Sequence, residues 1–581
     1  MSVVEQPQNI DAVDQPQPAA QSRWPRRKWY LSTLALGVAG SVLLWAALPK
    51  LSWWPLAWIA PVPWLLLIRR ETLCGIQPDV LPNRVHFVGH PYALIFKSGL
   101  LFWLAALWWL TLPHWTGYFG WMLLSLYLAF YVTAFIWLSR VAVHRLRVPL
   151  LVAAPVVWIG LEYTRAHLLS GFLLAGLGHT QYQWIELIQI SDIAGAYGVS
   201  FLVMFVSACL ARCLPDDGQP WSWRPLPLAA AALALALGYG YWRTSDVPTT
   251  PGPKIALIQG NIDTVFGGDY LATRKRTYDD YLRLSRQAVA EHDDLDLIIW
   301  PESMYRGPWI TVSEDAWMEA PSDAPDLTRE QSRQWLEAYA KEAAAAIADT
   351  ARTLDAPLLL GVDTQAFGPG TREVYSTALH VDADGRVLGH YHKMHPVIFG
   401  EYMPLGDVFP QLYELLPISS GLAKGAGPVV IEVDGARVAP NICYETVLPH
   451  LIRRQIHQLT EQQQKPQVLT TQTNDGWFYG SAALDFHLIC NVFRAVEMHT
   501  PLVTAANTGI SAHIDGSGRI VEAGPTRAER VIVAQVQLDP RGSFYLQTGD
   551  WLAGGSALFC GLLAGVGLWR RKTAPRRCEA V

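Results

Sequence analysis

The fold of this chain is decided by the stretch Arg437-Val-Ala-Pro-Asn-Ile-Cys443-Tyr-Glu445-Thr-Val-Leu-Pro. Its short apolar beginning, Arg437 to Ala439, predicts a buried strand. We expect this strand to break at Pro440-Asn441 and an amphipathic helix to follow. Cys443 then lies at a strand-to-helix turn, where free backbone N–H groups and the helix dipole favour the nucleophilic thiolate.

Two other stretches end a strand in a chemically useful side chain. One is Asp296-Leu-Ile-Ile-Trp-Pro-Glu302, and the other is Arg386-Val-Leu-Gly-His-Tyr-His-Lys393. A glutamate can move a proton, a lysine ammonium can stabilise an oxyanion, and a thiolate can carry an acyl group as a thioester. A lone cysteine is more commonly a small buried core residue. Together with these two strand ends, however, Cys443 predicts a thiol acyl-transfer site.

The order Trp-Pro-Glu302, His-Lys393 and Asn-Ile-Cys443-Tyr-Glu resembles the nitrilase superfamily. Domains of that superfamily carry a Glu-Lys-Cys triad in a four-layer αββα sandwich. The resemblance implies that Glu302 is the base, Lys393 the oxyanion partner and Cys443 the nucleophile. It also implies that the backbone N–H of Tyr444 is a second oxyanion donor.

Further segments resemble one branch of the superfamily, the apolipoprotein N-acyltransferases: Phe399-Gly-Glu401-Tyr, Cys443-Tyr-Glu445, Thr473-Asn-Asp-Gly-Trp-Phe and Ala506-Asn-Thr-Gly-Ile-Ser. The similarity extends from about residue 29 to the C-terminus. It implies that Glu401 and Glu445 support the triad. It also implies a phospholipid acyl donor and, as acceptor, the N-terminal amine of a diacylglyceryl-cysteine on an apolipoprotein. No cofactor is expected, because a thioester transfers readily to an amine without ATP or a metal.

The composition indicates a membrane protein. Hydrophobic residues make up 51% of the 581 residues and charged residues only 16%, an unusual balance for a soluble protein. The 25 tryptophans point the same way, because Trp concentrates at membrane interfaces. A net charge of -5 suggests no nucleic-acid partner. The seven cysteines lack paired spacing, so we expect neither a disulfide framework nor a zinc site.

Eight apolar runs approach the length needed to span a bilayer: about 29–48, 51–68, 94–112, 119–139, 149–164, 193–214, 226–242 and 551–569. A basic start followed by an apolar core is also typical of a secretory signal, but the later runs favour a retained first helix. We therefore expect a disordered cytoplasmic tail (1–28) and a seven-span membrane domain (29–244). A catalytic domain (245–548), a C-terminal span (549–570) and a basic cytoplasmic tail (571–581) follow.

Basic residues predict the orientation of these spans. With a cytoplasmic N-terminus, the inside loops carry Arg69, Arg70, Arg84, Arg140, Arg145, Arg147, Arg212 and Arg224. The short outside loops hold little beyond Lys50 and Arg165. This positive-inside pattern places residues 245–548 on the far side of the membrane. In a bacterium-like cell that side is the periplasm, so we expect an inner-membrane protein with a periplasmic catalytic domain.

From residue 254 onward the pattern predicts an α/β sandwich. Helices are expected over 270–291, 331–351 and 485–498. Strands are expected near 254–260, 296–300, 358–363, 375–382, 386–393, 429–433, 437–439, 467–473, 502–506, 511–515 and 530–537. Two hairpins are indicated by the Asp-Gly turns at 384–385 and 434–435.

Three segments leave two readings open. The glycine-interrupted segment within 165–192 is either a wall of a lipid-access path or a packed outer loop. Residues 304–330 are polar and contain prolines, which predicts a surface loop that could act as a lid. His390, His392 and His395 suggest either a metal site or hydrogen-bonded histidines around Lys393. We favour the second reading, because no further ligand at metal-binding spacing lies nearby.

Three functions remain to be compared. The first is a membrane acyltransferase that passes an acyl group from phospholipid to an amine through a thioester on Cys443. The second is a membrane-tethered amidohydrolase with the same triad, in which water resolves the intermediate. The third is a binding module without catalysis. Eight spans exceed what a tether requires, and the intact triad opposes the third reading. The eight spans would also hinder the assembly typical of soluble relatives, so we expect a monomer.

Overall fold

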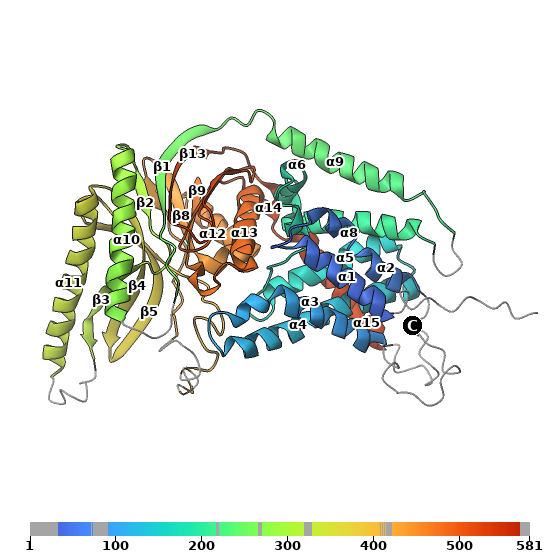
Figure 1. Cartoon of the computed structure of the whole chain (residues 1–581), viewed down its shortest axis with the longest axis horizontal. Helices are drawn as coiled ribbons and strands as arrows, with labels where there is room; N and C mark the ends of the chain where they lie inside the picture. Colours follow the sequence, from blue (N-terminus) through green and yellow to red (C-terminus); the bar gives the residue numbers. More distant parts are fainter. Residues whose placement is uncertain are drawn as a thin grey trace, which may run out of the picture.

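The computed structural model describes residues 33–70, 73, 91–215, 220–264, 270–318, 328–406, 408–409, 411, 413 and 421–569. Both predicted tails, the first residues of the first apolar run, and Arg84 lie outside these residues. Figure 1 shows an elongated molecule in which a helical part and an α/β part lie end to end. The chain passes from the helical part to the α/β part after α9 and returns through α15.

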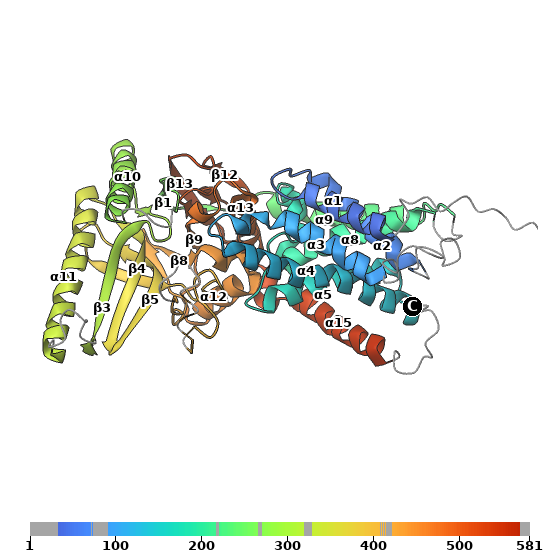
Figure 2. The same ribbon diagram turned by 60° about the horizontal axis from the view of Figure 1, so that its bottom comes forward.

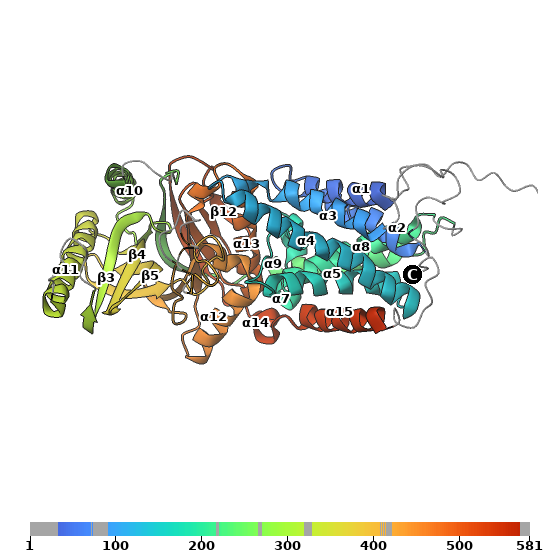
Figure 3. The same cartoon turned by 90° about the horizontal axis from the view of Figure 1, so that it is seen from below.

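The helical part places a helix at each of the eight apolar runs. These are α1 (Thr33–Ala47), α2 (Val62–Arg69), α3 (Pro91–Ala106), α4 (Gly117–Arg140), α5 (Leu150–His167), α8 (Ala196–Cys213), α9 (Leu226–Thr244) and α15 (Trp551–Trp569). Short helical turns connect them: η2 (Trp54–Trp58), η5 (Trp108–Thr111), η6 (Val141–Arg145), η7 (Gly178–Gln181), α6 (Ile185–Ile188) and α7 (Ser191–Ala194). In Figure 3, α15 lies along α5, although the two are about 400 positions apart in the sequence.

Within the described residues, three helical stretches are long and apolar enough to cross a membrane: Gly117–Arg145, Ala196–Cys213 and Trp551–Trp569. Three further apolar stretches are shorter: Thr33–Ala47, Trp54–Arg69 and Pro91–Ala106. The second run is not one regular helix, because α2 begins anew after its N-cap Pro61, which lies between η2 and α2. The count of eight spans therefore stays a prediction.

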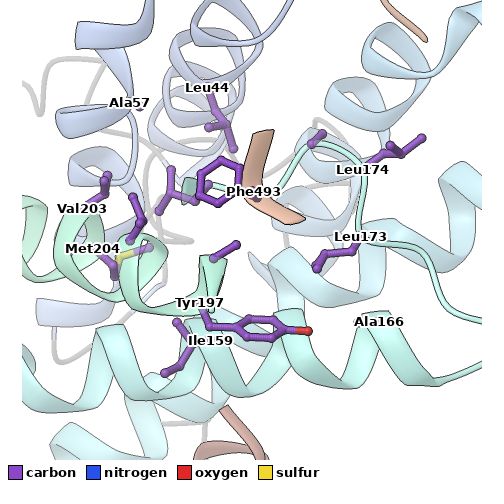
Figure 4. Packing of buried hydrophobic residues seen from close by; sticks show 14 of the residues in the cluster. Leu44, Ala57, Ile159, Ala166, Leu173, Leu174, Tyr197, Val203, Met204 and Phe493 are labelled. Atoms are coloured by element: carbon purple, nitrogen blue, oxygen red, sulfur yellow. The ribbon is translucent and has the colours of Figure 1, made fainter. Parts of the chain in front are cut away.

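Small residues allow the helices to approach closely. A Cβ on Gly160 of α5 would lie 2.7 Å from the backbone of Ser556 in α15, and one on Gly40 of α1 would lie 2.5 Å from the Trp64 ring. Helices that meet through glycine gain van der Waals contact between their backbones. Figure 4 shows the resulting cluster of buried side chains between α1, α5 and α8.

The α/β part contains two sheets. The seven-stranded sheet has the order β13-β1-β2-β4-β5-β6, and β3 also pairs with β4. Its strands are β1 (Thr250–Gln259), β2 (Leu297–Ile299), β3 (Tyr305–Trp317), β4 (Leu358–Pro369), β5 (Thr371–Val381), β6 (Val387–His392) and β13 (Arg530–Leu538). The six-stranded sheet has the order β12-β11-β10-β9-β8-β7. Its strands are β7 (Ile431–Val433), β8 (Ala436–Ile442), β9 (Val468–Thr473), β10 (Leu502–Ala506), β11 (Ala512–Ile514) and β12 (Ile520–Ala523).

The two sheets pack face to face and helices cover their outer faces, which confirms the predicted αββα sandwich. In β1, Ile255 and Leu257 enter the core between the sheets, whereas Ala256 and Ile258 face the helical layer. That layer consists of α10 (Tyr270–Glu291) and α11 (Arg329–Leu354). The other sheet is covered by α12 (Pro449–Glu461) and α13 (Ala482–Met498), as Figure 2 shows. Both predicted hairpins, β5–β6 and β7–β8, form.

Two predictions of secondary structure are wrong. The strand that begins near residue 437 does not break at Pro440-Asn441, because both residues pair with β9 and β8 extends to Ile442. β7 pairs with β8 only as far as Val438, and a proline is tolerated where a strand has one neighbour. Residues 305–317 are not a loop but β3, whose register shifts at Pro308 where it joins the sheet edge. The lid reading therefore fails for this stretch, while 319–327 lie outside the described residues.

The helical part and the α/β part share one hydrophobic core. Buried residues of α12 and α13 belong to the same cluster as those of α1, α5 and α8. Figure 4 shows Phe493 of α13 inserted among side chains of these helices. The helical layer on the six-stranded sheet thus fills the space between that sheet and the helical part. This packing fixes the two sheets relative to the apolar helices.

Candidate active site

The three predicted catalytic residues follow the ends of three strands. Glu302 comes three residues after β2, Lys393 directly after β6, and Cys443 directly after β8. β2 and β6 belong to the seven-stranded sheet and β8 to the six-stranded sheet, so the site lies where the two sheets meet. Strands place their terminal residues precisely only when their registers are set by neighbours, here β4, β5 and β9.

Lys393 lies between two carboxylates. Its Nζ is 2.9 Å from Oε1 of Glu302 and 2.5 Å from Oε1 of Glu401. The lysine side chain is fully buried, and Glu302 is 8% exposed. The structure thus brings together Glu302, Lys393 and Glu401, which the sequence reading selected separately.

Backbone and hydroxyl groups hold both carboxylates in place. Oε1 of Glu302 accepts a hydrogen bond from the Ser376 hydroxyl, and Oε2 accepts one from the backbone N–H of Asn474. Oε2 of Glu401 accepts a hydrogen bond from the backbone N–H of Val397. Sequence reasoning missed Ser376 and Val397. Asn474 lies in one of the segments that carry the family resemblance, Thr473-Asn-Asp-Gly-Trp-Phe, which by itself does not indicate this hydrogen bond.

The charges of this cluster are strongly coupled. Burial alone would lower the pKa of the Lys393 ammonium, but Glu302 and Glu401 outweigh burial and hold that pKa well above its ordinary value. Burial raises the pKa of Glu401, although Lys393 opposes the rise. Lys393 therefore remains an ammonium at neutral pH. A fixed positive charge in a buried site can stabilise a developing oxyanion.

Cys443 is the first residue of η9 (Cys443–Val447), has a φ of 52° and is partly buried. A left-handed backbone is uncommon for a residue other than glycine and clusters at functional sites. Burial, followed by the negative charge of Glu302, raises the pKa of its thiol well above the ordinary value, although Lys393 opposes them. The predicted preference for the thiolate is therefore wrong for the resting site. A thiol in this state needs a base to remove its proton.

Glu445 connects the turn that carries Cys443 to the end of β6. Its carboxylate accepts hydrogen bonds from the backbone N–H groups of Ile442, Met394 and His395 and from the Tyr391 hydroxyl. Burial raises its pKa, and the hydrogen bond from Ile442 opposes that rise. One side chain thus holds together the residues that flank Cys443 and Lys393.

Tyr444 makes a contact that the sequence did not reveal. Its hydroxyl donates to the backbone carbonyl of Gly171, in the segment after α5. His395 also contacts this segment, with its Nε2 3.1 Å from the Ser170 hydroxyl oxygen. Residues 171–181 are buried. The segment is therefore packed between the apolar helices and the turn that carries Cys443, which favours the packed-loop reading. Its part in a lipid-access path stays a prediction.

The three histidines near Lys393 have partners other than a metal. Nδ1 of His392 is 2.9 Å from the Thr377 hydroxyl, and its ring stacks on Tyr375 with centroids 4.3 Å apart. The His390 ring lies 4.8 Å from the Trp309 ring. No group of three or more His, Cys, Asp or Glu residues in the part of the chain that the structure describes is arranged to hold a metal ion.

Comparison with known proteins matches both parts of the chain. Residues 254–544 match the carbon-nitrogen hydrolase family, and residues 40–209 match the apolipoprotein N-acyltransferase N-terminal domain. An apolipoprotein N-acyltransferase from Rhodopirellula baltica is 32% identical over 91% of this chain and 96% of its own length. The chain belongs to the apolipoprotein N-acyltransferase family. It is thus a membrane protein of a family of acyltransferase enzymes.

A second apolipoprotein N-acyltransferase, from Geobacter metallireducens, is 32% identical over 91% of this chain and 93% of its own length. Among solved structures, an amidase from Nesterenkonia sp. covers 52% of this chain and 96% of its own at 18% identity. Its TM-score of 0.33 supports no conclusion about this chain. The family assignment rests on the sequence relatives, which extend across both the helical part and the α/β part.

Proposed function

We propose that this protein transfers a fatty acyl chain from a phospholipid to the N-terminal amine of the diacylglyceryl-cysteine of apolipoproteins. The observation that supports it most is the buried Glu302–Lys393 pair, 2.9 Å apart, whose two charges act on the Cys443 thiol. This arrangement occurs in a chain whose family match also covers the apolar helices. Both proposed substrates are anchored in a bilayer, which explains why a catalytic domain would be joined to such helices.

The first half-reaction forms a thioester on the enzyme. Glu302 accepts the proton of the Cys443 thiol, and the sulfur attacks the ester carbonyl of the phospholipid. The Lys393 ammonium and the backbone N–H of Tyr444 donate to the oxyanion that develops. When the tetrahedral intermediate collapses, the ester C–O bond breaks and the lysophospholipid alkoxide takes the proton from Glu302.

The second half-reaction transfers the acyl group to the amine. Glu302, again a carboxylate, accepts a proton from the amine as its nitrogen attacks the thioester carbonyl. The C–S bond breaks, Cys443 leaves as a thiolate, and Glu302 returns a proton to it. Glu401 keeps Lys393 in position during both steps, and Glu445 fixes the turns on which Lys393 and Cys443 lie.

We also propose the membrane arrangement that the charge pattern predicts. Eight spans cross the bacterial inner membrane, residues 245–548 lie in the periplasm, and both tails are cytoplasmic. Arg69, Arg140, Arg145 and Arg212 support this, because each lies in the last turn of its helix, at the end that the charge pattern assigns to the cytoplasm. The protein acts as a monomer.

The alternative is a membrane-tethered amidohydrolase. The match of residues 254–544 to carbon-nitrogen hydrolases is the observation that favours it, since the same three residues would serve. The two functions differ in what resolves the thioester, an amine or water.

Intact-mass measurement of the full-length protein separates them. The protein is incubated with phospholipid vesicles and no acceptor, then with a diacylglyceryl-cysteine peptide. We expect a gain of one fatty acyl group that the peptide removes and acquires. Cys443→Ser should gain nothing, whereas Cys490→Ser, a buried cysteine of α13, should behave like the unaltered protein. An adduct that water alone removes would support the hydrolase, and no adduct would exclude both enzymes.

A further inference from the structure

Asp475 and His487 form a buried pair that the mechanism above does not use. Asp475 lies in the turn η10 (Asp475–Trp477) that follows β9, and His487 lies in the second turn of α13. Nδ1 of His487 is 2.7 Å from Oδ1 of Asp475, and their side chains are 11% and 1% exposed. Asp475 also accepts a hydrogen bond from the Thr473 hydroxyl.

This pair is joined to Glu302 through a single residue, Asn474. The residue before Asp475 is Asn474, whose backbone N–H donates to Oε2 of Glu302 at 3.2 Å. The side chain of Asn474 is itself fixed, because its Oδ1 accepts from Asn507 and from Gly476. The position of Asp475 therefore affects the hydrogen bond that orients Glu302.

The charge of Asp475 also reaches the nucleophile. After burial and Glu302, the negative charge of Asp475 contributes to the raised pKa of the Cys443 thiol. A bare carboxylate at this place would oppose formation of the thiolate that attacks the substrate. A compensating positive charge next to Asp475 would remove this opposition.

His487 is placed to supply that charge. Burial alone would lower the pKa of its imidazole, but Asp475 and, further away, Glu302 outweigh burial and raise it. Lys393 is the cation that opposes this rise. The charged groups that act on His487 thus come from η10 and from the ends of β2 and β6, and their net effect favours the imidazolium.

We propose that His487 is a positioning residue for acyl transfer, whose imidazolium neutralises Asp475 so that this carboxylate does not oppose the Cys443 thiolate. The pair also keeps the turn that holds Glu302 in place. The chemistry is electrostatic, and no bond to substrate is made. It deepens the proposed function, on which it rests through the role of Cys443 as nucleophile.

The test measures the ionisation of Cys443 without any acyl transfer. The rate of alkylation by iodoacetamide is followed against pH in the full-length protein, and the rate in Cys443→Ser is subtracted to remove the other cysteines. In His487→Gln the pH at which the alkylation rate is half-maximal, here called the midpoint, should rise by about one pH unit, because about tenfold less thiolate forms at a given pH. His380→Gln, which changes a buried histidine of β5 outside the site, should leave the midpoint unchanged.

A second experiment removes both charges of the pair at once. In the double variant Asp475→Asn with His487→Gln, both charges are absent, so the midpoint should return to that of the unaltered protein. A midpoint that does not rise in His487→Gln, or that stays raised in the double variant, would overturn the proposal. If thermal unfolding shows that His487→Gln does not fold, Asp475→Asn replaces it in the test. If the two charges of the native pair cancel, the pH midpoint of alkylation should be unchanged in this variant. If the pair is purely structural, that midpoint should be displaced.

Acylation by phospholipid vesicles is measured on the same variants. His487→Gln should acylate about tenfold more slowly near neutral pH, in proportion to its thiolate fraction, and the double variant should recover. No acylation in the unaltered protein would exclude the proposed function, yet the alkylation result would still decide the role of His487.

Discussion

Lys393 is the residue on which the site depends most. It is fully buried and contacts Glu302 and Glu401, so three ionisable groups share one water-poor space. An isolated buried charge is strongly unfavourable, whereas a paired one is tolerated. The two carboxylates thus keep the lysine charged, and the lysine in turn keeps the two carboxylates from repelling one another.

We predict that Lys393→Met abolishes acylation and lowers the melting temperature. Loss of one oxyanion donor reduces acyl-transfer rates by about 10²–10³-fold, and removing one partner of a buried ion pair destabilises a protein by about 3–5 kcal/mol. Both are measured on the same preparation, by intact mass and by thermal unfolding.

The double variant Lys393→Met with Glu401→Gln is the control. It removes one unpaired carboxylate, so the melting temperature should partly recover while acylation remains absent. If acylation also recovers, Lys393 has no direct part in the chemistry.

At the scale of elements, the end of β2 is placed by its neighbour β4. Gly361 of β4 lies directly against the backbone of Pro301 and Glu302. A Cβ there would meet the Pro301 carbonyl oxygen at 2.0 Å and the Glu302 Cα at 2.8 Å. Only glycine leaves room for so close an approach of two backbones. Gly361 thus sets the position of Glu302 without touching its carboxylate.

We predict that Gly361→Ala impairs acylation because the Pro301–Glu302 backbone must move away. A misplacement of about 1 Å at a reacting group can reduce the rate by about 10²-fold. The matched control is Gly389→Ala in β6, where a Cβ meets nothing closer than Ile431 at 4.0 Å. Equal acylation rates for the two variants would show that the β2–β4 contact does not position the base.

At the scale of the whole molecule, polar contacts fasten the α/β part onto the helical part. Asp192 of α7 binds His499, Arg243 and the Tyr239 hydroxyl. Nearby, Oε1 of Glu497 accepts from the backbone N–H of Ala196, the first residue of α8, at 2.7 Å. The contacts of Asp192 with His499 and of Glu497 with Ala196 cross between the two parts, so these parts are joined by directed polar contacts as well as by their shared hydrophobic core.

Glu497 makes this junction sensitive to pH. Burial raises the pKa of its carboxyl to about 7, and Arg494, which lies 2.7 Å from Oε2, opposes the rise. In an unfolded chain the pKa of a glutamate is about 4.3. A raised folded-state pKa gives stability that is present below about pH 4 and is lost as the pH rises through about 7.

We therefore predict that the melting temperature contains a component that falls between about pH 4 and about pH 7. This component should be missing in Glu497→Gln, whatever the absolute stability of that variant. Glu342→Gln, a change on the exposed side of α11, should leave the pH dependence unchanged. An identical slope in Glu497→Gln would mean that another group titrates.

Much of this protein can be predicted from its sequence. Local patterns predict the apolar runs, the helix over 270–291 and both hairpins. Helix and strand periodicities depend on residues that are close together in the sequence, so they can be recognised without the fold. The candidate residues Glu302, Lys393 and Cys443 could be selected because each ends a strand in a recognisable motif. The predictions of a strand break at Pro440 and of a loop around Pro308 are wrong, because the neighbouring strand determines whether a proline is tolerated in a sheet.

What the sequence determined is the fold class, the family and the three residues proposed to catalyse the reaction. What only the tertiary structure decided is how those residues act on one another. The protonated resting state of Cys443, the contact of Tyr444 with Gly171, and the Asp475–His487 pair all depend on groups brought together from distant parts of the chain. Charge, burial and hydrogen bonding act through space, whereas local patterns extend only along the chain.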